Sequence, residues 1–243
     1  VKSAAPVTVN RLHLETEGPA FDREWMLVDE AGKFVTQREL PSLALLKAEV
    51  SNELTLEFDG QTLTLPLLRS ASRKMVQVWS DSVEAEVENA GEWLSAIFGR
   101  PLELVRIGAG KRITGKEQDR SVRFPDAYPL HFCTLESLSD LNARLNAPVE
   151  ILRFRPNIVL SGAPAFAEDS WAGIRIGAWE FPISKACTRC AITTVDLQTG
   201  KKGPEPLKTL STYRKKGSKV EFGQYLTSAA GAELEVGMEV TAF

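Results

Sequence analysis

The sequence contains few cysteines and histidines, and this shortage excludes several classes of protein. Of its 243 residues, three are cysteine and two are histidine. An odd and small number of cysteines in a chain of this length cannot form the disulfide framework of a small secreted domain, and it fits a compartment in which thiols stay reduced. We therefore expect a cytoplasmic protein.

Long apolar runs and a strong charge of one sign are also missing. The longest apolar stretches, LALLKA and NIVLSG, are far shorter than the ~20 residues that a membrane-spanning helix needs. A net charge of −3, from 29 basic and 32 acidic residues, argues against a dedicated nucleic-acid binder. With 43% hydrophobic and 25% charged residues, the chain has a globular composition. We expect a folded protein that partners neither nucleic acid nor membrane.

The first half of the chain has the pattern of an antiparallel sheet or a small barrel. Short segments that alternate apolar and polar residues run from Arg23 to about Arg106, and glycines at Gly32 and Gly60 provide tight turns between them. A helix is expected over Val87–Phe98, where apolar residues recur at helical spacing before Gly99.

The second half begins with a stretch of low periodicity and then alternates strand-like and helical segments. We expect a long loop or linker over Ile107–Pro129, followed by a helix capped by Thr134. Further strand-like segments include Ala178–Ile183 and Ala191–Val195.

The densest chemical signal is the stretch KACTRC, which places Cys187 and Cys190 three positions apart. A structural zinc site would need four ligands, and the remaining cysteine and the two histidines have no suitable spacing. A thioredoxin-like pair would start a helix, whereas the β-branched residues after Cys190 favour a strand. On composition alone, two small buried side chains at a strand end explain the pattern best.

Basic residues beside the cysteines point to a more specific chemistry. Lys185 and Arg189 flank the thiols, and nearby cations favour the thiolate form that acts as a nucleophile or a soft metal ligand. A second basic cluster, Arg153–Asn157, leads into an apolar strand, and its arginines have the shape to bind phosphate. Ordinary ion pairing with acidic residues is the alternative for any single arginine.

Seven short motifs in sequence order resemble one known family. They are VKS at the start, FDR before a strand, RFRPNIV, EDSW, CTRC, EPLKTL and FGQY. Together they are similar to the MOSC superfamily (molybdenum cofactor sulfurase C-terminal domain) with its N-terminal β-barrel partner, in the branch that contains the mitochondrial amidoxime-reducing component and bacterial proteins that detoxify N-hydroxylated bases. The match covers essentially the whole chain.

The resemblance implies a fold and a cofactor. The fold would be α+β but mostly β, with an N-terminal β-barrel-like domain over residues 1–106 packed on a β-barrel MOSC domain with a few helices over residues 107–243. A molybdenum cofactor (molybdenum bound to molybdopterin) would lie between the two. Pyridoxal phosphate binding is a further label of the superfamily, to which the resemblance assigns no residue.

The resemblance also implies site residues. Cys190 would be the protein ligand to molybdenum and a catalytic residue, with Cys187 in a supporting or structural role. A soft thiolate suits a metal that is already bound by dithiolene sulfurs. The positions that would hold the pterin and its phosphate are Lys2, Ser3, Arg23, Arg155, Asn157, Thr188, Arg189 and Tyr225. Asp126, Ala127 and Tyr128 align with a loop over the pterin, where animal relatives carry Thr-Ser at the last two positions.

A reductase of this family would act on small N-hydroxylated compounds, namely hydroxylamines, N-hydroxylated bases and amidoximes. The reaction needs a proton donor, for which Asp126 is the candidate by position and Tyr225 a second one. The histidines His13 and His131 are expected to be packing or surface residues, because neither lies in a matched motif.

Electrons would have to come from a separate protein. A plant-type [2Fe–2S] domain needs four cysteines in a fixed pattern, and three are present. We therefore expect a flavoprotein, a ferredoxin or a haem protein as electron donor. Two alternatives stay open: a non-catalytic carrier that passes on the cofactor or its sulfur, and a β-rich protein with structural cysteines and no cofactor.

Overall fold

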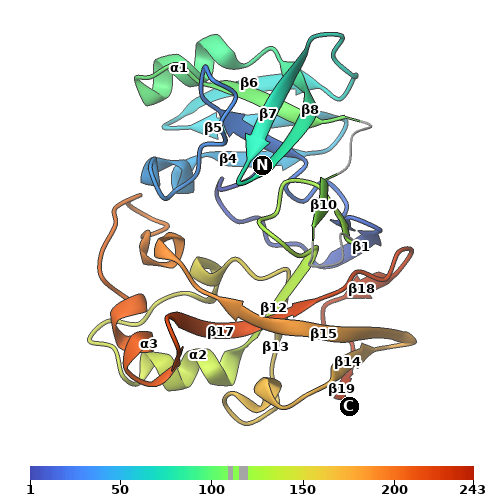
Figure 1. Ribbon diagram of the computed structural model, residues 1–243, viewed down its shortest axis with the longest axis vertical. Coiled ribbons are helices and arrows are strands. Elements are labelled where there is room, and N and C mark those ends of the chain that lie inside the picture. Colours follow the sequence, from blue (N-terminus) through green and yellow to red (C-terminus); the bar gives the residue numbers. More distant parts are fainter. Residues whose placement is uncertain (109–111, 115–119) are drawn as a thin grey trace. The chain divides into compact units, whose positions relative to one another are not determined.

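The computed structural model describes residues 1–108, 112–114 and 120–243, which are mostly β with three α-helices (Figure 1). The expected α+β, mostly β class is therefore confirmed. The chain forms two compact units, one from residues 1–7, 21–127 and 197–200 and the other from residues 8–20, 128–196 and 201–243. No helix in the described part of the chain is long and apolar enough to cross a membrane.

Two antiparallel sheets build most of the first unit. The smaller sheet has the order β4-β5-β6 and the larger β3-β9-β8-β7. Their bounds are β3 (Trp25–Val28), β4 (Lys47–Val50), β5 (Glu53–Phe58), β6 (Gln61–Pro66), β7 (Arg73–Val78), β8 (Asp81–Glu88) and β9 (Glu103–Ile107). In β5, Leu54 and Leu56 are buried on one face, as the alternating sequence predicts. Asp59 and Gly60 are both left-handed, as the turn between β5 and β6 requires.

A single helix covers part of the first unit. α1 (Gly91–Phe98) buries Leu94 in a core shared with the smaller sheet, and it ends at a left-handed Gly99. The predicted helix began at Val87, which was wrong, because Val87 belongs to β8 and pairs with Val105. Strand pairing at Val87 therefore outweighs the helical spacing of the apolar residues.

The second unit is built on a seven-stranded sheet of order β13-β12-β17-β15-β14-β19, with β16 paired to β17 (Figure 1). The strands are β12 (Leu130–Thr134), β13 (Ile158–Leu160), β14 (Gly173–Ile176), β15 (Trp179–Thr188), β16 (Lys215–Lys216), β17 (Lys219–Leu226) and β19 (Val240–Ala242). The pair β12 and β13 is parallel, and the other pairs are antiparallel. A separate three-stranded sheet contains β1 (Arg11–Glu15), β2 (Gly18–Pro19) and β18 (Glu233–Glu235).

Two helices share one core beside this sheet. α2 (Leu135–Asn142) and α3 (Leu207–Tyr213) bury Leu141 and Leu210 with Phe154 and Phe222. Thr134 caps α2 as predicted, since its hydroxyl oxygen accepts a hydrogen bond from the Ser137 N–H at 3.3 Å. Sequence reasoning missed α3.

Two further predictions need correction. Within the expected linker Ile107–Pro129, the structure has two paired strands, β10 (Arg112–Thr114) and β11 (Arg120–Val122), while residues 109–111 and 115–119 lie outside the described residues. The expected strand Ala191–Val195 was also wrong, because a 3₁₀ helix, η4 (Ala191–Thr194), occupies it. The hydroxyl of Thr193 donates to the Cys190 carbonyl, and local side-chain bonds of this kind compete with strand pairing.

Gly223 is the position in β17 where a side chain has no room. Its φ of +74° is left-handed, and a Cβ there would lie 2.5 Å from the carbonyl oxygen of Phe132. We expect Gly223→Ala to lower the free energy of unfolding by about 3 kcal/mol, from the left-handed strain and the displaced strand together. Gly217 has a similar φ of +60° and open space around it. Gly217→Ala should cost about 1 kcal/mol. If denaturant titrations give the same loss in free energy of unfolding for both variants, the crowding around Gly223 does not contribute to stability as we expect.

Candidate functional site

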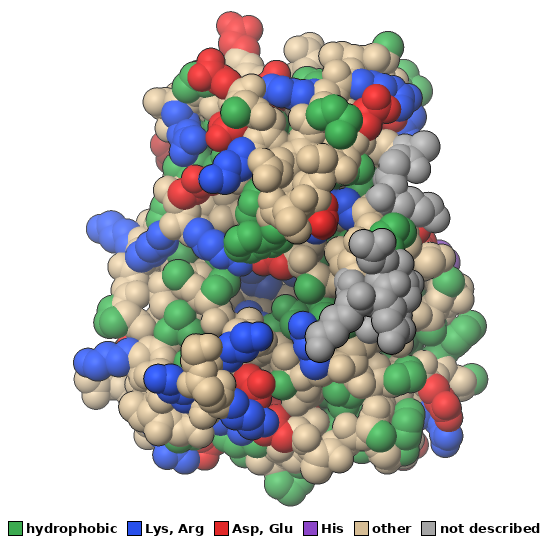
Figure 2. Space-filling view, in the orientation of Figure 1, with side chains coloured by type: hydrophobic (Ala, Val, Ile, Leu, Met, Phe, Trp, Pro, Cys, Tyr) green, Lys and Arg blue, Asp and Glu red, His purple; other side chains and the backbone are tan. Residues whose placement is uncertain are grey.

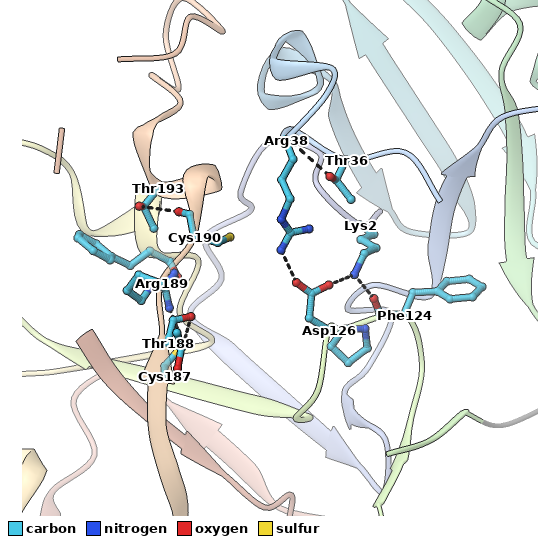
Figure 3. A network of polar contacts seen from close by, with 12 residues as sticks. Lys2, Thr36, Arg38, Phe124, Asp126, Cys187, Thr188, Arg189, Cys190 and Thr193 are labelled. Carbon is cyan, nitrogen blue, oxygen red and sulfur yellow. Dashed lines mark hydrogen bonds and ion pairs between the residues drawn. The ribbon is translucent and has the colours of Figure 1, made fainter. Parts of the chain in front are cut away.

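The candidate residues of the first unit gather around one carboxylate. Asp126 accepts hydrogen bonds from Lys2 Nζ at 2.5 Å and from Arg38 Nη2 at 2.7 Å, one on each carboxylate oxygen (Figure 3). Lys2 Nζ also donates to the Phe124 carbonyl at 2.7 Å. The backbone N–H of Phe124 in turn donates to the Arg23 carbonyl. Lys2, Arg23 and Asp126, which lie far apart in the sequence, therefore meet in one cluster.

The charges in this cluster fix its protonation. Burial alone would raise the pKa of Asp126, but the adjacent Lys2 and Arg38 outweigh burial and hold this pKa well below its usual range. Asp126 is consequently a carboxylate at neutral pH, which speaks against the predicted role as proton donor. Burial also lowers the pKa of Lys2 to about 8, although Asp126 opposes the shift. Lys2 is therefore the member of the cluster that can exchange a proton near neutral pH.

Three of the candidate residues hold a left-handed backbone, which is strained for residues other than glycine. These are Ser3, Arg23 and Arg155, with φ of 65°, 50° and 56°. Strain of this kind persists where the surroundings enforce it, and it gathers at binding and active sites. The carbonyl of Ser3 accepts a hydrogen bond from Gln37 at 2.8 Å, and Arg155 ends the 3₁₀ helix η2 (Ile151–Phe154). Phe21, Asp59, Trp79 and Phe166 share this conformation, so it supports the three candidate positions without singling them out.

In the second unit, Arg189 is the centre of the candidate site. Its Nη2 donates to the Phe154 carbonyl at 2.7 Å, and its Nη1 lies 2.6 Å from the sulfur of Cys187 and 3.4 Å from Nε2 of His131. Its own backbone N–H donates to the Val220 carbonyl. One guanidinium therefore joins β12, β15 and the turn before Arg155.

His131 connects the remaining members. The backbone N–H of Asn157 donates to the His131 carbonyl at 2.7 Å, and the Asn157 side-chain oxygen accepts from the His131 N–H at 3.1 Å. The His131 ring lies 5.5 Å from the ring of Tyr225, which stacks on Tyr128 at 4.6 Å. Tyr128, a residue of the loop that the resemblance places over the pterin, therefore makes a definite side-chain contact with Tyr225.

Cys190 is held at a bend and is reachable from outside. Strand β15 has register shifts between Ile183 and Lys185 and between Ala186 and Thr188, so the strand bends just before the cysteine. Cys190 follows as the residue that precedes η4, where its carbonyl accepts from the Thr193 N–H at 3.1 Å. Its side chain is partly exposed, whereas Cys133 and Cys187 are buried. The other predicted residue of this turn, Thr188, is exposed.

The residues of the second unit suit an anionic, sulfur-bound metal group. Cys190 offers an accessible soft ligand, and Arg155, Asn157 and Thr188 offer cationic, amide and hydroxyl donors. Arg189 Nε is a buried donor that has no hydrogen-bond partner within the described residues. Since buried donors are almost always satisfied, this atom is consistent with a hydrogen-bond acceptor outside the chain.

Sequence reasoning missed Arg38, which lies in no matched motif. The expectation that His131 is a packing or surface residue agrees with its burial, but it did not extend to the contacts with Arg189 and Asn157. His131 is buried, and its ring nitrogen also lies 3.6 Å from the sulfur of Cys133. The spacing of His131 and Cys133, two residues apart on a strand, could have signalled that both side chains share one face. The other histidine, His13, is half exposed and pairs with Glu233, as a surface residue does.

Comparisons with known proteins identify the family of the chain. The family model described as "MOSC domain" matches residues 119–241, and the one described as "MOSC N-terminal beta barrel domain" matches residues 1–101. These matches confirm the expected family and its N-terminal barrel.

Named relatives carry two kinds of description. The chain is 32% identical to a molybdenum cofactor sulfurase of Oryza sativa subsp. japonica, over 99% of this chain and 34% of the relative. It is 34% identical to mitochondrial amidoxime-reducing component 1 of Xenopus laevis, over 93% of this chain and 74% of the relative. The chain thus spans about a third of the sulfurase. A solved Bordetella bronchiseptica structure aligns with a TM-score of 0.32 at 21% identity, over 39% of this chain and 85% of its own, too loosely to support a conclusion.

Asp126→Asn tests the charge cluster of the first unit. The change removes the negative charge between Lys2 and Arg38, and we expect a loss on the order of 2 kcal/mol in the free energy of unfolding at pH 7. The folded-state pKa of Asp126 is depressed, so its contribution is complete above the unfolded pKa of about 4 and declines as pH falls further. The difference in the free energy of unfolding between wild type and variant, measured by denaturant titration, should therefore become smaller below about pH 4.

Glu57→Gln is the matched control in the same unit. Glu57 pairs with Lys47 at 2.8 Å on the exposed surface. Its loss should cost about 0.5 kcal/mol or less. If Asp126→Asn lowers the free energy of unfolding by no more than this, or by the same amount down to pH 3, the Asp126 charge does not stabilise the fold as we expect.

Proposed function

Because the chain belongs to the MOSC family, we propose that it binds the molybdenum cofactor and reduces small N-hydroxylated compounds with electrons from a separate donor protein. The observation that carries the proposal is the partly exposed Cys190, which follows a bend in β15 and is next in sequence to Arg189, a member of a partly buried network with His131 and Asn157. A soft thiolate is the ligand that a molybdenum centre with dithiolene sulfurs favours.

Each unit carries cationic and hydrogen-bonding groups that suit an anionic pterin phosphate. In the second unit, Arg155, Asn157, Thr188 and Tyr225 would bind the pterin and its phosphate, and Arg189 would orient the Cys190 turn. In the first unit, the resemblance assigns Lys2, Ser3 and Arg23 to the same group. The left-handed backbone at Ser3, Arg23 and Arg155 supports this assignment, because folding keeps such strain only where the fold enforces it.

The chemistry would be the removal of one oxygen from nitrogen. When bound, the molybdenum centre supplies the two-electron reduction. The substrate takes up two electrons and two protons, its N–O bond breaks, an N–H bond forms and water leaves. The proton donor would be Tyr225, the second candidate from the sequence, because Lys2 and Arg38 hold Asp126 in its carboxylate form. Asp126 would instead hold Lys2 and Arg38 in place.

A carrier that passes on the cofactor or its sulfur is the second candidate. The sulfurase relative, and a second cysteine whose sulfur lies 2.6 Å from Arg189, support it. The same binding residues would serve both functions. Turnover by metal-loaded protein with an artificial reductant separates the two, because a carrier would bind the cofactor and reduce nothing.

Cys190→Ser tests the ligand. We expect protein from a cofactor-producing host to contain about one molybdenum per chain in the wild type and almost none in the variant, because serine oxygen is a harder ligand. Reduction of an amidoxime with a viologen reductant should disappear with the metal.

Cys133→Ser is the control for the loss of a thiol. Cys133 is fully buried in the hydrophobic core, and its removal should leave the metal content unchanged. Full molybdenum content in Cys190→Ser, measured by elemental analysis, would refute the ligand assignment.

A further inference from the structure

The segment from Lys201 to Lys219 carries charge of the opposite sign to the rest of the chain. It contains six lysines and one arginine against one glutamate, a net charge of +6 over 19 residues. Because the whole chain has a net charge of −3, the other 224 residues together carry −9. The positive charge of the chain is therefore concentrated in this segment.

All six lysines of the segment are exposed. They lie before α3, on α3, and on β16 and the start of β17, and we call them the lysine surface: Lys201, Lys202, Lys208, Lys215, Lys216 and Lys219. Figure 2 shows Lys and Arg side chains gathered over the part of the molecule where Figure 1 places α3. Within the segment, Arg214 pairs with Asp169 at 2.7 Å and Lys216 pairs with Glu221 at 2.9 Å.

The lysine surface and Cys190 lie on elements that are connected in sequence and packed against each other. The helix η4 starts directly after Cys190, and α3 packs against it. Beyond η4, the Gly203 N–H donates to the Thr194 carbonyl at 3.0 Å, and the Asp196 N–H donates to the Lys201 carbonyl at 2.8 Å. A protein that docks on the lysines therefore comes close to the proposed metal ligand within one unit.

The composition of this surface selects among negatively charged partners. No large hydrophobic side chain that is exposed in the described part of the chain lies between residues 201 and 219. Tyr213, the aromatic residue of the segment, is half buried against Phe166. Insertion into a membrane interface and stacking of nucleic-acid bases both need exposed aromatic or apolar groups. Binding to lipid head groups or to nucleic-acid phosphates by charge alone needs no such groups, so the choice of a protein partner rests on the electron donor that the proposed reaction requires and on charge complementarity.

We propose that the lysine surface docks the acidic face of a small electron-transfer protein, which delivers electrons to the site of Cys190. This proposal rests on the proposed reductase function. Attraction between unlike charges speeds encounter and orients the partner without a large apolar interface, which suits a contact that forms and breaks in every catalytic cycle.

Charge reversal on the lysine surface tests the proposal. The test variant is K208E/K215E/K219E, and the control is K33E/K47E/R175E, which reverses three exposed cations elsewhere and changes the net charge equally. The probe is an oxidised acidic [2Fe–2S] ferredoxin, titrated calorimetrically into metal-loaded protein at an ionic strength of about 0.05 M. We expect the dissociation constant to rise about tenfold or more for the test variant and about twofold or less for the control. High salt should shrink the difference.

Equal weakening by both variants, or by neither, would overturn the proposal. So would tighter binding of anionic phospholipid vesicles or of single-stranded RNA than of the ferredoxin, when that binding is lost in the test variant. Turnover with a viologen reductant is measured separately and should be the same in the test variant and the wild type. The wild type could bind the ferredoxin on the lysine surface and yet reduce no N-hydroxylated compound. That result would refute the proposed function and would still support the docking surface.

Discussion

The guanidinium of Arg189 is the interaction on which the arrangement of the second unit depends most. A carbonyl of the turn before Arg155, a sulfur of β15 and a ring nitrogen of β12 all meet this one side chain. The Phe154 carbonyl and the His131 ring lie 35 and 58 positions from Arg189, so local structure alone could not position them, whereas Cys187 is two positions away. The guanidinium is a rigid planar cation whose donors point in fixed directions, so it sets the geometry of three such partners more strictly than a flexible lysine would.

In the first unit, a negative charge brings together residues that are distant in sequence. Asp126 lies between two cations, and it makes the burial of Lys2 tolerable. A buried charge without a partner is costly, so the three residues are coupled: each one stabilises the charged form of its neighbour. The price of this coupling is that Asp126 cannot also serve as an acid.

The sequence allowed the fold to be predicted where the signal is local. Alternating residues predicted β5, and the hydroxyl of Thr134 predicted the start of α2. Prediction failed where distant contacts decide, as at Val87, whose helical spacing lost to pairing with β9, and at Thr193, whose β-branched side chain bonds to its own backbone instead of joining a sheet. Motifs pointed to Cys190 and Arg155, whereas Arg38 was beyond reach because its role exists only through Asp126, 88 positions away.

The left-handed backbone at Ser3, Arg23 and Arg155 is strained, and this strain lowers the stability of the folded protein. Glycine would relax the backbone at each of these positions, and asparagine would tolerate it better than arginine. A search for hardier variants would therefore be drawn toward Arg155→Gly and its counterparts, which remove the very side chains offered for anion binding. Directed evolution of this scaffold for heat resistance alone would favour replacing the side chains at its left-handed positions, which include these three proposed cofactor contacts.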